Sequence, residues 1–522
     1  MPEKEFDNIL ERIFETSIFI FVGIIISKIF SYIYKIIIAR YFGVEIYGLY
    51  SLSLVIILLF ALVSGFGISE GILRYISLYR GKNENDKIRY LFRMSMKILL
   101  FSTITIAIIS FFLAEFISLT IFKNPSLTIY LKIFSFLIPI WIFAGFFHSI
   151  MIAFEKVKQQ TIIEKIVQSS AKLGFLLIFL ALGLKTNAVI FSFFLGIVVF
   201  FIATYLYCKY SLSTLFLDYN LNNSETKKIR KNLLSYSLPI MFFGMAFYLF
   251  YWTDSLVLGF FKTTTEVGIY NAAIPIALLL SLAPELFITL LFPIITKQYA
   301  RKNMGLIRDL SKQIGKWIFI INFPLFFLMV LFPGAIINLF FGSEYLLASN
   351  ALRFLLLANL FASLIVISHK LLLMVGKTKI LLMDLLIATV LNFVLNVILV
   401  PMPFIFGFDN ASGLNGAAIS TFISILVFNS LIFFHARKYT SITPLSGKLY
   451  KIILIAIIPI IILFFIRSSI VVTNLSLILL TISFILVYLL LLFLMKGLDK
   501  DDMYVIETLK GKLSSKINKN RI

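Results

Sequence analysis

Residues 18–39 read IFIFVGIIISKIFSYIYKIIIA, an apolar run that only two lysines and a few small or aromatic polar residues interrupt. At the rise of an α-helix, a run of about 20 residues is long enough to cross the ~30 Å hydrocarbon core of a bilayer. The run is continuous rather than alternating, so it indicates a helix and not a strand of a membrane barrel.

Further runs of this kind follow along the chain, at residues 47–69, 94–116, 129–153, 162–183, 187–208, 235–261, 268–294, 317–341, 350–374, 380–400, 412–434, 449–468 and 475–495. The sequence therefore predicts an all-α polytopic membrane protein with about fourteen transmembrane helices. The composition agrees, because 60% of the 522 residues are hydrophobic and only 14% are charged. A soluble domain has about 25% charged residues, so a typical soluble enzyme is excluded.

The chain also lacks the residues that most enzymes and metal sites need. It has one Cys and three His, which excludes a disulfide framework and a zinc finger. It has no GxxxxGK[ST] motif for ATP and no cluster that suggests glycosyltransferase or polymerase chemistry. We therefore expect no enzymatic activity and no resident cofactor.

Lys and Arg are distributed unequally between the connections. If the N-terminus lies inside, the inside segments hold 36 Lys and Arg and the outside segments hold 7. The positive-inside rule then places both termini in the cytoplasm and the chain in the cell membrane as a multi-pass protein. It also explains most of the net charge of +22, so no nucleic-acid partner is needed.

The N-terminal segment MPEKEFDNILERIFE is acidic on balance, which is untypical of a cleavable signal peptide. Its apolar residues recur at helical spacing, so we expect an amphipathic helix at the membrane surface. The predicted organisation has an N-terminal segment, a six-helix lobe, a cytoplasmic linker, a second six-helix lobe, two extra helices and a basic tail: residues 1–16, 17–208, 209–234, 235–436, 437–495 and 496–522.

The two lobes are predicted from an internal repeat. Residues 45–50 read EIYGLY and residues 266–270 read EVGIY, which match with one gap at an offset of 220 residues. The connections at 155–158 and 376–379 each carry two lysines, and these match at an offset of 221. Because each unit has six spans, the halves are parallel repeats related by an axis along the membrane normal, which is a transporter architecture.

Three short motifs carry a family resemblance: ARYFGVEIYGLY at 39–50, Asp254 followed by VGIYNAA at 267–273, and GLNGAAIS at 413–420. With the spans and the repeat, they resemble the polysaccharide-biosynthesis branch of the multidrug/oligosaccharidyl-lipid/polysaccharide (MOP) exporter superfamily. The resemblance covers roughly residues 10–440. It implies a protein similar to O-antigen flippases, which move a glycan on a polyprenyl or dolichyl (pyro)phosphate from the inner to the outer leaflet. Other members of the superfamily export cationic drugs in exchange for sodium or protons.

Lysines inside the predicted spans are the first candidate site. Lys28 and Lys35 share one face of a helix, and Lys172 lies near the middle of another span. Charges at this depth are costly and functional by default, and lysines that face a central cavity suit a phosphate or pyrophosphate. The alternatives are pairing with a carboxylate for Lys28 and Lys172, and snorkelling to the interface for Lys35. Arg74 is a candidate entry contact for the lipid phosphate, or the partner of Glu70 one turn away.

Acidic and amide side chains in the second half are the other candidate site. The resemblance implies a sodium site in some flippases, to which Asp254, Asn392, Asn396 and Thr421 correspond here. Asn396 replaces the second acid of that pattern, so a cation should bind more weakly. Glu285 is a further candidate for cation coupling. Coupling to sodium, to a proton or to the membrane potential stays open, and the alternative is a buried polar network between helices.

These observations predict a flippase for lipid-linked oligosaccharides that works by alternating access in surface polysaccharide or glycoprotein synthesis. The expected partners are the lipid-linked oligosaccharide, membrane lipids and glycan polymerases or glycosyltransferases. One alternative is a cation-coupled multidrug exporter of the same superfamily, which should have a cavity dominated by acids and aromatics. The other is a non-transporting scaffold for polysaccharide assembly, which has no reason to carry charges near the midplane.

Overall fold

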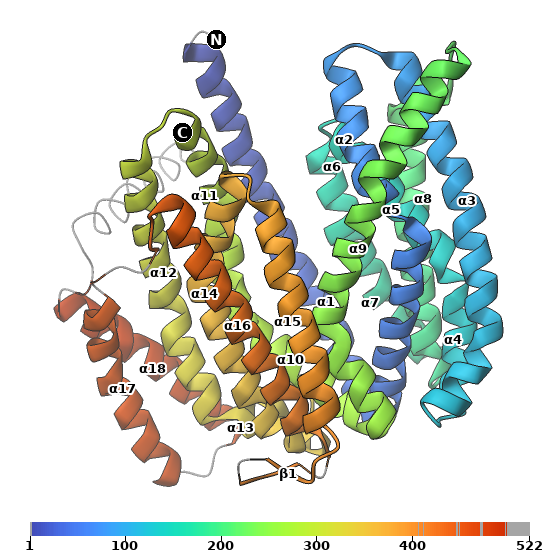
Figure 1. The fold of residues 1–522 in the computed structure, drawn as a ribbon. Helices are drawn as coiled ribbons and strands as arrows, with labels where there is room; N and C mark the ends of the chain where they lie inside the picture. The colour runs from blue at the N-terminus through green and yellow to red at the C-terminus, as the bar shows by residue number, and fades with distance from the viewer. Residues whose placement is uncertain are drawn as a thin grey trace, which may run out of the picture.

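The protein is described from a computed structural model, which places residues 3–495 and 497 apart from 406, 411, 445–446, 448 and 470–472. Nearly all of these residues are helical, and Figure 1 shows the helices gathered in two groups. The all-α fold predicted from the sequence is thus confirmed. The predicted basic tail at 496–522 lies, except for Gly497, outside the described residues.

The first lobe runs through α1 (Glu3–Gly65), α2 (Ile68–Gly81), α3 (Asn85–Phe116), η1 (Ile117–Ile121), α4 (Leu127–Ser135), α5 (Leu137–Ala153), α6 (Val157–Thr161), η2 (Ile162–Val167), α7 (Gln168–Ala181), α8 (Asn187–Ser211) and η3 (Ser213–Phe216). The helix expected for the N-terminal segment is present and continues without a break into the first span. Whether this segment lies at a membrane surface stays a prediction.

The second lobe runs through α9 (Asn223–Phe261), α10 (Thr264–Ala277), η4 (Leu278–Ser281), α11 (Leu282–Ala300), α12 (Met304–Leu331), α13 (Pro333–Phe340), η5 (Ser343–Ala348), α14 (Ser349–Met374), α15 (Thr378–Leu399), β1 (Phe404–Ile405), β2 (Phe408–Asp409) and α16 (Leu414–Thr440). The two short strands pair antiparallel, with Ile405 opposite Phe408. The extra pair consists of α17 (Leu449–Ser469) and α18 (Asn474–Leu494).

The number of spans differs from the expected fourteen. Eleven described helices are long and apolar enough to cross a membrane, and the pair α4–α5, bent by 45°, makes a twelfth. One cause is α1, which joins two expected spans across Gly43, where φ is 81° and the backbone is not helical. Another is the segment α6–η2–α7, which is less apolar because it carries Glu164, Lys165 and Lys172.

The internal repeat is visible as a reciprocal contact between α1 and α10. A Cβ atom on Gly48 would lie 1.8 Å from the carbonyl oxygen of Thr264, and one on Gly268 would lie 2.3 Å from that of Val44. Both glycines therefore allow the two backbones to approach closely, as small residues do between membrane helices. Gly268 and Thr264 follow Gly48 and Val44 by 220 residues, so the contact joins positions that the repeat makes equivalent.

The hydrophobic core is shared at one end of the bundle and divided at the other. One cluster joins residues of both lobes around Tyr47 and Tyr270. Toward the end with the N-terminus, a first-lobe cluster around Phe92 and a second-lobe cluster around Leu291 are separate. Figure 1 shows the same arrangement, with the two groups close together at the β1 end and diverging toward the N-terminus.

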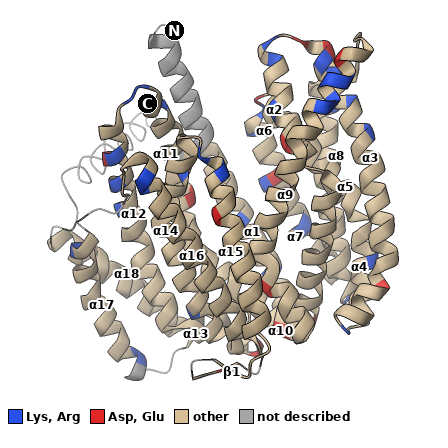
Figure 2. Cartoon of the chain, in the orientation of Figure 1, with Lys and Arg blue, Asp and Glu red and all other residues tan. Residues whose placement is uncertain are grey.

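Helix α9 connects the lobes physically. Leu233 in its first half packs in the first-lobe cluster, whereas Phe250 in its second half packs against second-lobe residues such as Leu385. Figure 2 shows that Lys and Arg gather at the end of the molecule that carries the N-terminus. This is the distribution that the positive-inside rule requires, while the orientation of the termini stays a prediction.

Candidate functional site

Asp254 on α9 is the centre of a buried polar cluster in the second lobe. The residue is 5% exposed, and its carboxylate accepts a hydrogen bond from Tyr270 Oη on α10 at 2.5 Å. Asn396 Nδ2 on α15 donates to Oδ1 at 2.8 Å, and Asn392 Nδ2 lies 3.5 Å from the same atom. Thr421 Oγ1 on α16 donates to Oδ2. The structure thus brings together the four residues that the sequence grouped, from three helices.

Two oxygen atoms of this cluster have no hydrogen-bond partner. The side-chain oxygens of Asn392 and Asn396 are both buried and unbonded, although both amide nitrogens face Asp254. Buried polar atoms are rarely left unsatisfied, so each such atom calls for an explanation. One carboxylate, two amide oxygens and two hydroxyls fit a hard monovalent cation, which prefers oxygen ligands. No group of three or more His, Cys, Asp or Glu suited to a metal occurs in the described part of the chain.

Glu285, also expected to couple to a cation, lies elsewhere. Its Oε2 atom on α11 is 2.9 Å from Lys28 Nζ on α1, and Ser281 Oγ lies 3.5 Å from the same nitrogen. The alternative that Lys28 pairs with a carboxylate is therefore the arrangement observed. The ion pair joins the first lobe to the second, and Tyr32 on α1 adds a hydrogen bond to the carbonyl of Pro275 at 3.2 Å.

Lys35 and Lys172 have no anionic partner among the described residues. Lys172 on α7 lies over the ring of Phe193 with Nζ 4.6 Å from its centroid, and 5.8 Å from that of Trp141. Lys35 on α1 lies within electrostatic range of Lys172. Neither ammonium group makes an ion pair or hydrogen bond with any described residue. Two neighbouring positive charges of the first lobe are therefore uncompensated inside the helix bundle.

Arg74 on α2 lies apart from these lysines. Its guanidinium is 4.2 Å from the ring centroid of Tyr236 on α9 and 5.7 Å from that of Tyr75. The local ion pair with Glu70 that the spacing allowed is not formed in the described structure. The residue therefore lies where α2 of the first lobe meets α9 of the second.

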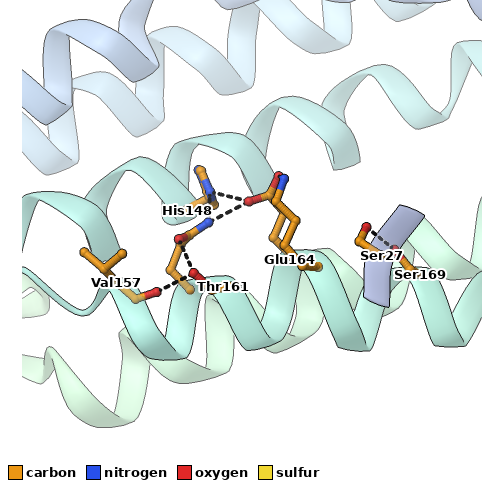
Figure 3. A network of polar contacts seen from close by, with 8 residues as sticks. Ser27, His148, Val157, Thr161, Glu164 and Ser169 are labelled. Carbon is orange, nitrogen blue, oxygen red and sulfur yellow. Dashed lines mark hydrogen bonds and ion pairs between the residues drawn. The ribbon is translucent and has the colours of Figure 1, made fainter. Parts of the chain in front are cut away.

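Two polar features were missed in the sequence. Tyr270 was noted only as part of a motif, although its hydroxyl is a direct partner of Asp254. A network in the first lobe joins His148 on α5 to Glu164 on η2 at 3.0 Å, with Gln160 bonded to both (Figure 3). A similar pair occurs in the second lobe, where Asp384, 220 residues after Glu164, lies 2.9 Å from His435.

A sequence model of a protein family, described as "Polysaccharide biosynthesis protein", matches residues 13–298 of the chain. This is more than half of its length. The chain belongs to the polysaccharide biosynthesis protein family. The MatE family model also matches, at residues 239–398, and the protein is a member of the MOP superfamily.

Proteins similar to this chain include two archaeal proteins. The "Probable low-salt glycan biosynthesis flippase Agl15" of Haloferax volcanii is 26% identical over 53% of this chain and 54% of its own length. An uncharacterized membrane protein of Methanocaldococcus jannaschii is 26% identical over 47% of each chain. The chain thus spans about half the length of the curated relatives it matches.

Solved structures of multidrug resistance MATE family transporters of the MOP superfamily share the fold. An inward-facing structure has a TM-score of 0.66 at 16% identity, covering 80% of this chain and 94% of that one. An outward-facing structure has a TM-score of 0.58 at 16% identity, covering 83% and 96%. These likenesses confirm the predicted architecture of the bundle.

The two lobes differ at positions that the repeat makes equivalent. Asp254, Tyr270 and Asn392 each follow a first-lobe residue by 220 positions, and those residues are Tyr34, Tyr50 and Lys172. Tyr34 and Tyr50 contact each other edge to face with centroids 6.1 Å apart, as a neutral counterpart of the Asp254–Tyr270 pair. At these positions the first lobe therefore carries two tyrosines and a lysine, where the second carries a carboxylate, a tyrosine and an amide.

Proposed function

We propose that this protein flips a lipid-linked oligosaccharide, a glycan on a polyprenyl or dolichyl (pyro)phosphate, from the cytoplasmic to the outer leaflet for surface polysaccharide or glycoprotein synthesis. The observation that carries the proposal is the pair of uncompensated lysines, Lys35 and Lys172, inside the first lobe. An ammonium group without a partner is costly inside a membrane, and an anionic head group would repay that cost. The name of the Haloferax relative supports the same class of substrate.

In the proposed transport cycle, the first lobe binds the phosphate of the substrate and the two lobes rock against each other. In the described arrangement the cores separate toward the N-terminal end, which we place at the cytoplasm. Lys35 and Lys172 would bind the phosphate as point charges, while the glycan occupies the space between the lobes. Rocking of the lobes about the Gly48–Gly268 contact would then expose the substrate on the other side.

We propose sodium as the coupling ion, held by Asp254, the two asparagine oxygens and the hydroxyls of Thr421 and Tyr270. Sodium, when bound, supplies a positive charge that offsets the carboxylate. The support is the donor set of oxygens and the two unbonded amide oxygens. The same cluster and the MATE-like fold also favour a second candidate function, export of cationic drugs in exchange for a cation.

A leaflet-translocation assay separates these functions. The protein is reconstituted in vesicles with a fluorescent polyprenyl-pyrophosphate oligosaccharide, and the label outside is bleached by a membrane-impermeant reductant. We expect wild-type protein to make the protected label accessible far faster than protein-free vesicles do. A matched experiment uses a cationic dye under a sodium or proton gradient. Dye export without translocation of the glycan lipid would reject the flippase and support the drug exporter.

Reversing the ion pair between the lobes is expected to show that its two charges act together. Lys28→Glu and Glu285→Lys each place like charges where the pair now lies 2.9 Å apart, so each should slow translocation about tenfold. The double variant restores an ion pair and should recover most of the rate. As a control, the same three variants of Lys132 and Glu115, a pair within the first lobe, should change the rate less than about twofold. Single variants as active as wild type, or a double variant as slow as the singles, would contradict a bridging role.

A further inference from the structure

A pocket with two arginines opens at the end of the bundle that carries β1. Its volume is ≈ 480 Å³, and it lies between the end of α12, the short helix α13, the start of α14 and the extra helix α17. Its polar lining consists of Arg353 on α14, Arg467 on α17, Asn338 and Ser349. This place is far along the chain from the lysines of the first lobe and belongs to neither site described above.

The two arginines are not neutralised by any described residue. Arg353 donates from Nε to the carbonyl oxygen of Val330 at 3.3 Å and from Nη1 to the side-chain oxygen of Asn350, which leaves Nη2 free. Arg467 makes no ion pair or hydrogen bond within the described part of the chain. Glu344, an acidic residue of the neighbouring η5 segment, lies against Gly43 of α1 and, in the described structure, pairs with neither arginine.

The two guanidinium groups are close enough to repel each other across the pocket. They come from different parts of the fold, one from the second lobe and one from the extra helix pair. An anion between them would remove the repulsion and tie α17 to the second lobe. Guanidinium groups bind phosphate oxygens in a planar, bidentate manner, which two arginines that line one pocket are suited to do.

We propose that this pocket binds the phosphate group of a membrane lipid. The position supports a lipid rather than a soluble anion, because α17 is an apolar helix long enough to cross a membrane and Arg467 lies in its last turn. Two sources share this chemistry, the head group of an anionic phospholipid and the phosphate of a polyprenyl-linked glycan. The proposal goes beyond the flippase function and does not depend on it.

The pocket is lined in part by α13, and α1 of the first lobe forms hydrogen bonds with the C-terminal end of this helix. Arg40 on α1 donates to the carbonyl oxygens of Asn338, Leu339 and Phe340, at the C-terminal end of α13, at distances of 2.6–2.8 Å. Side chains that bond the last carbonyls of a helix are favourable contacts. A lipid phosphate beside Asn338 would therefore bind at a helix that α1 of the first lobe contacts through Arg40.

Binding to purified protein in neutral detergent tests the proposal, with native mass spectrometry as the measurement. The probes are dihexanoyl phosphatidic acid, geranyl phosphate, inorganic phosphate and, as a lipid without phosphate, dihexanoyl glycerol. All measurements are made in a Lys172→Ala background, so that binding at the first-lobe lysines does not interfere. We expect saturable binding of the two lipid phosphates and none of dihexanoyl glycerol, and the tighter of the two identifies the source.

Arg467→Gln is the decisive variant, since Arg467 is exposed and its loss should not impair folding. It should weaken binding of both lipid phosphates by about tenfold or more, as expected for the loss of a charged hydrogen-bond donor. Arg467→Lys should weaken it less, and Lys185→Gln, an exposed lysine in the connection between α7 and α8, should leave it unchanged. Equal binding by the Lys172→Ala protein with and without Arg467→Gln, or equal binding of dihexanoyl glycerol, would overturn the proposal. Tighter binding of inorganic phosphate than of either lipid would reject the lipid as the ligand.

Discussion

Replacing Lys172 by methionine should slow translocation of the labelled polyprenyl-pyrophosphate oligosaccharide about a hundredfold. Lys172 has no anionic partner in the described structure and lies over Phe193, so its ammonium group is free to bind the phosphate. Loss of a hydrogen bond to a charged group costs about 1.5–3 kcal/mol, which corresponds to a factor of ten to more than a hundred. The rate is measured as the accessible label over time in vesicles of equal protein content.

The choice of substitution separates charge from packing. Lys172 also packs against Gly196, where a Cβ atom would lie 2.2 Å from the lysine side chain, so an alanine leaves a void. Methionine keeps most of the apolar stem and removes only the charge. Lys172→Arg keeps the charge and should retain much of the rate, whereas Lys172→Met and Lys172→Ala should be similarly slow.

Lys97→Met is the matched control for Lys172→Met, because Lys97 is also a lysine inside an expected span but is exposed on α3. It should leave the rate within about twofold of wild type, as most surface substitutions do. An active Lys172→Met variant would remove the main support for a phosphate site in the first lobe. The cationic side chain would then be a structural partner of Phe193 and Trp141.

Local patterns in the sequence were sufficient for the fold class. Long apolar runs, basic connections and the repeat predicted a helical bundle of two lobes, and the reciprocal contact of Gly48 and Gly268 joins positions that the repeat makes equivalent. The count of fourteen spans is not confirmed, since α1 joins two expected spans across the non-helical Gly43 and four charged residues lie in α6–η2–α7. Hydropathy reports which segments are apolar, and it does not report how they are joined.

The candidate sites depended on information that local patterns do not contain. Asp254 and Asn396 were grouped only through a family resemblance, because spacing along the chain cannot place α9 beside α15. For the same reason Glu285 was grouped with Asp254, whereas the structure pairs it with Lys28 across the lobes. Tyr270 could have been found through the repeat, since it occupies the position of Tyr50, but nothing in either motif says that its hydroxyl faces an acid.

Asp254→Asn is expected to make translocation independent of sodium. The substitution keeps the size of the side chain and removes the one negative charge of the cluster, so a cation would lose its only anionic ligand. For wild type we expect translocation to be at least about tenfold faster with a sodium gradient than without, which corresponds to about 1.4 kcal/mol. For Asp254→Asn the two rates should be equal. The measurement compares vesicles that contain sodium on one side with vesicles that contain choline on both sides.

The control for Asp254→Asn is Glu285→Gln, because Glu285 is also an acid of the second lobe but pairs with Lys28 outside the cluster. It should keep the ratio of the rates with and without sodium, whatever it does to the rate itself. A sodium effect that survives in Asp254→Asn would show that the ion binds elsewhere. If wild type responds to a proton gradient and not to sodium, the unbonded oxygens of Asn392 and Asn396 have no cation to bind. Asp254 would then carry the proton itself, with Tyr270 and Thr421 as its hydrogen-bond partners.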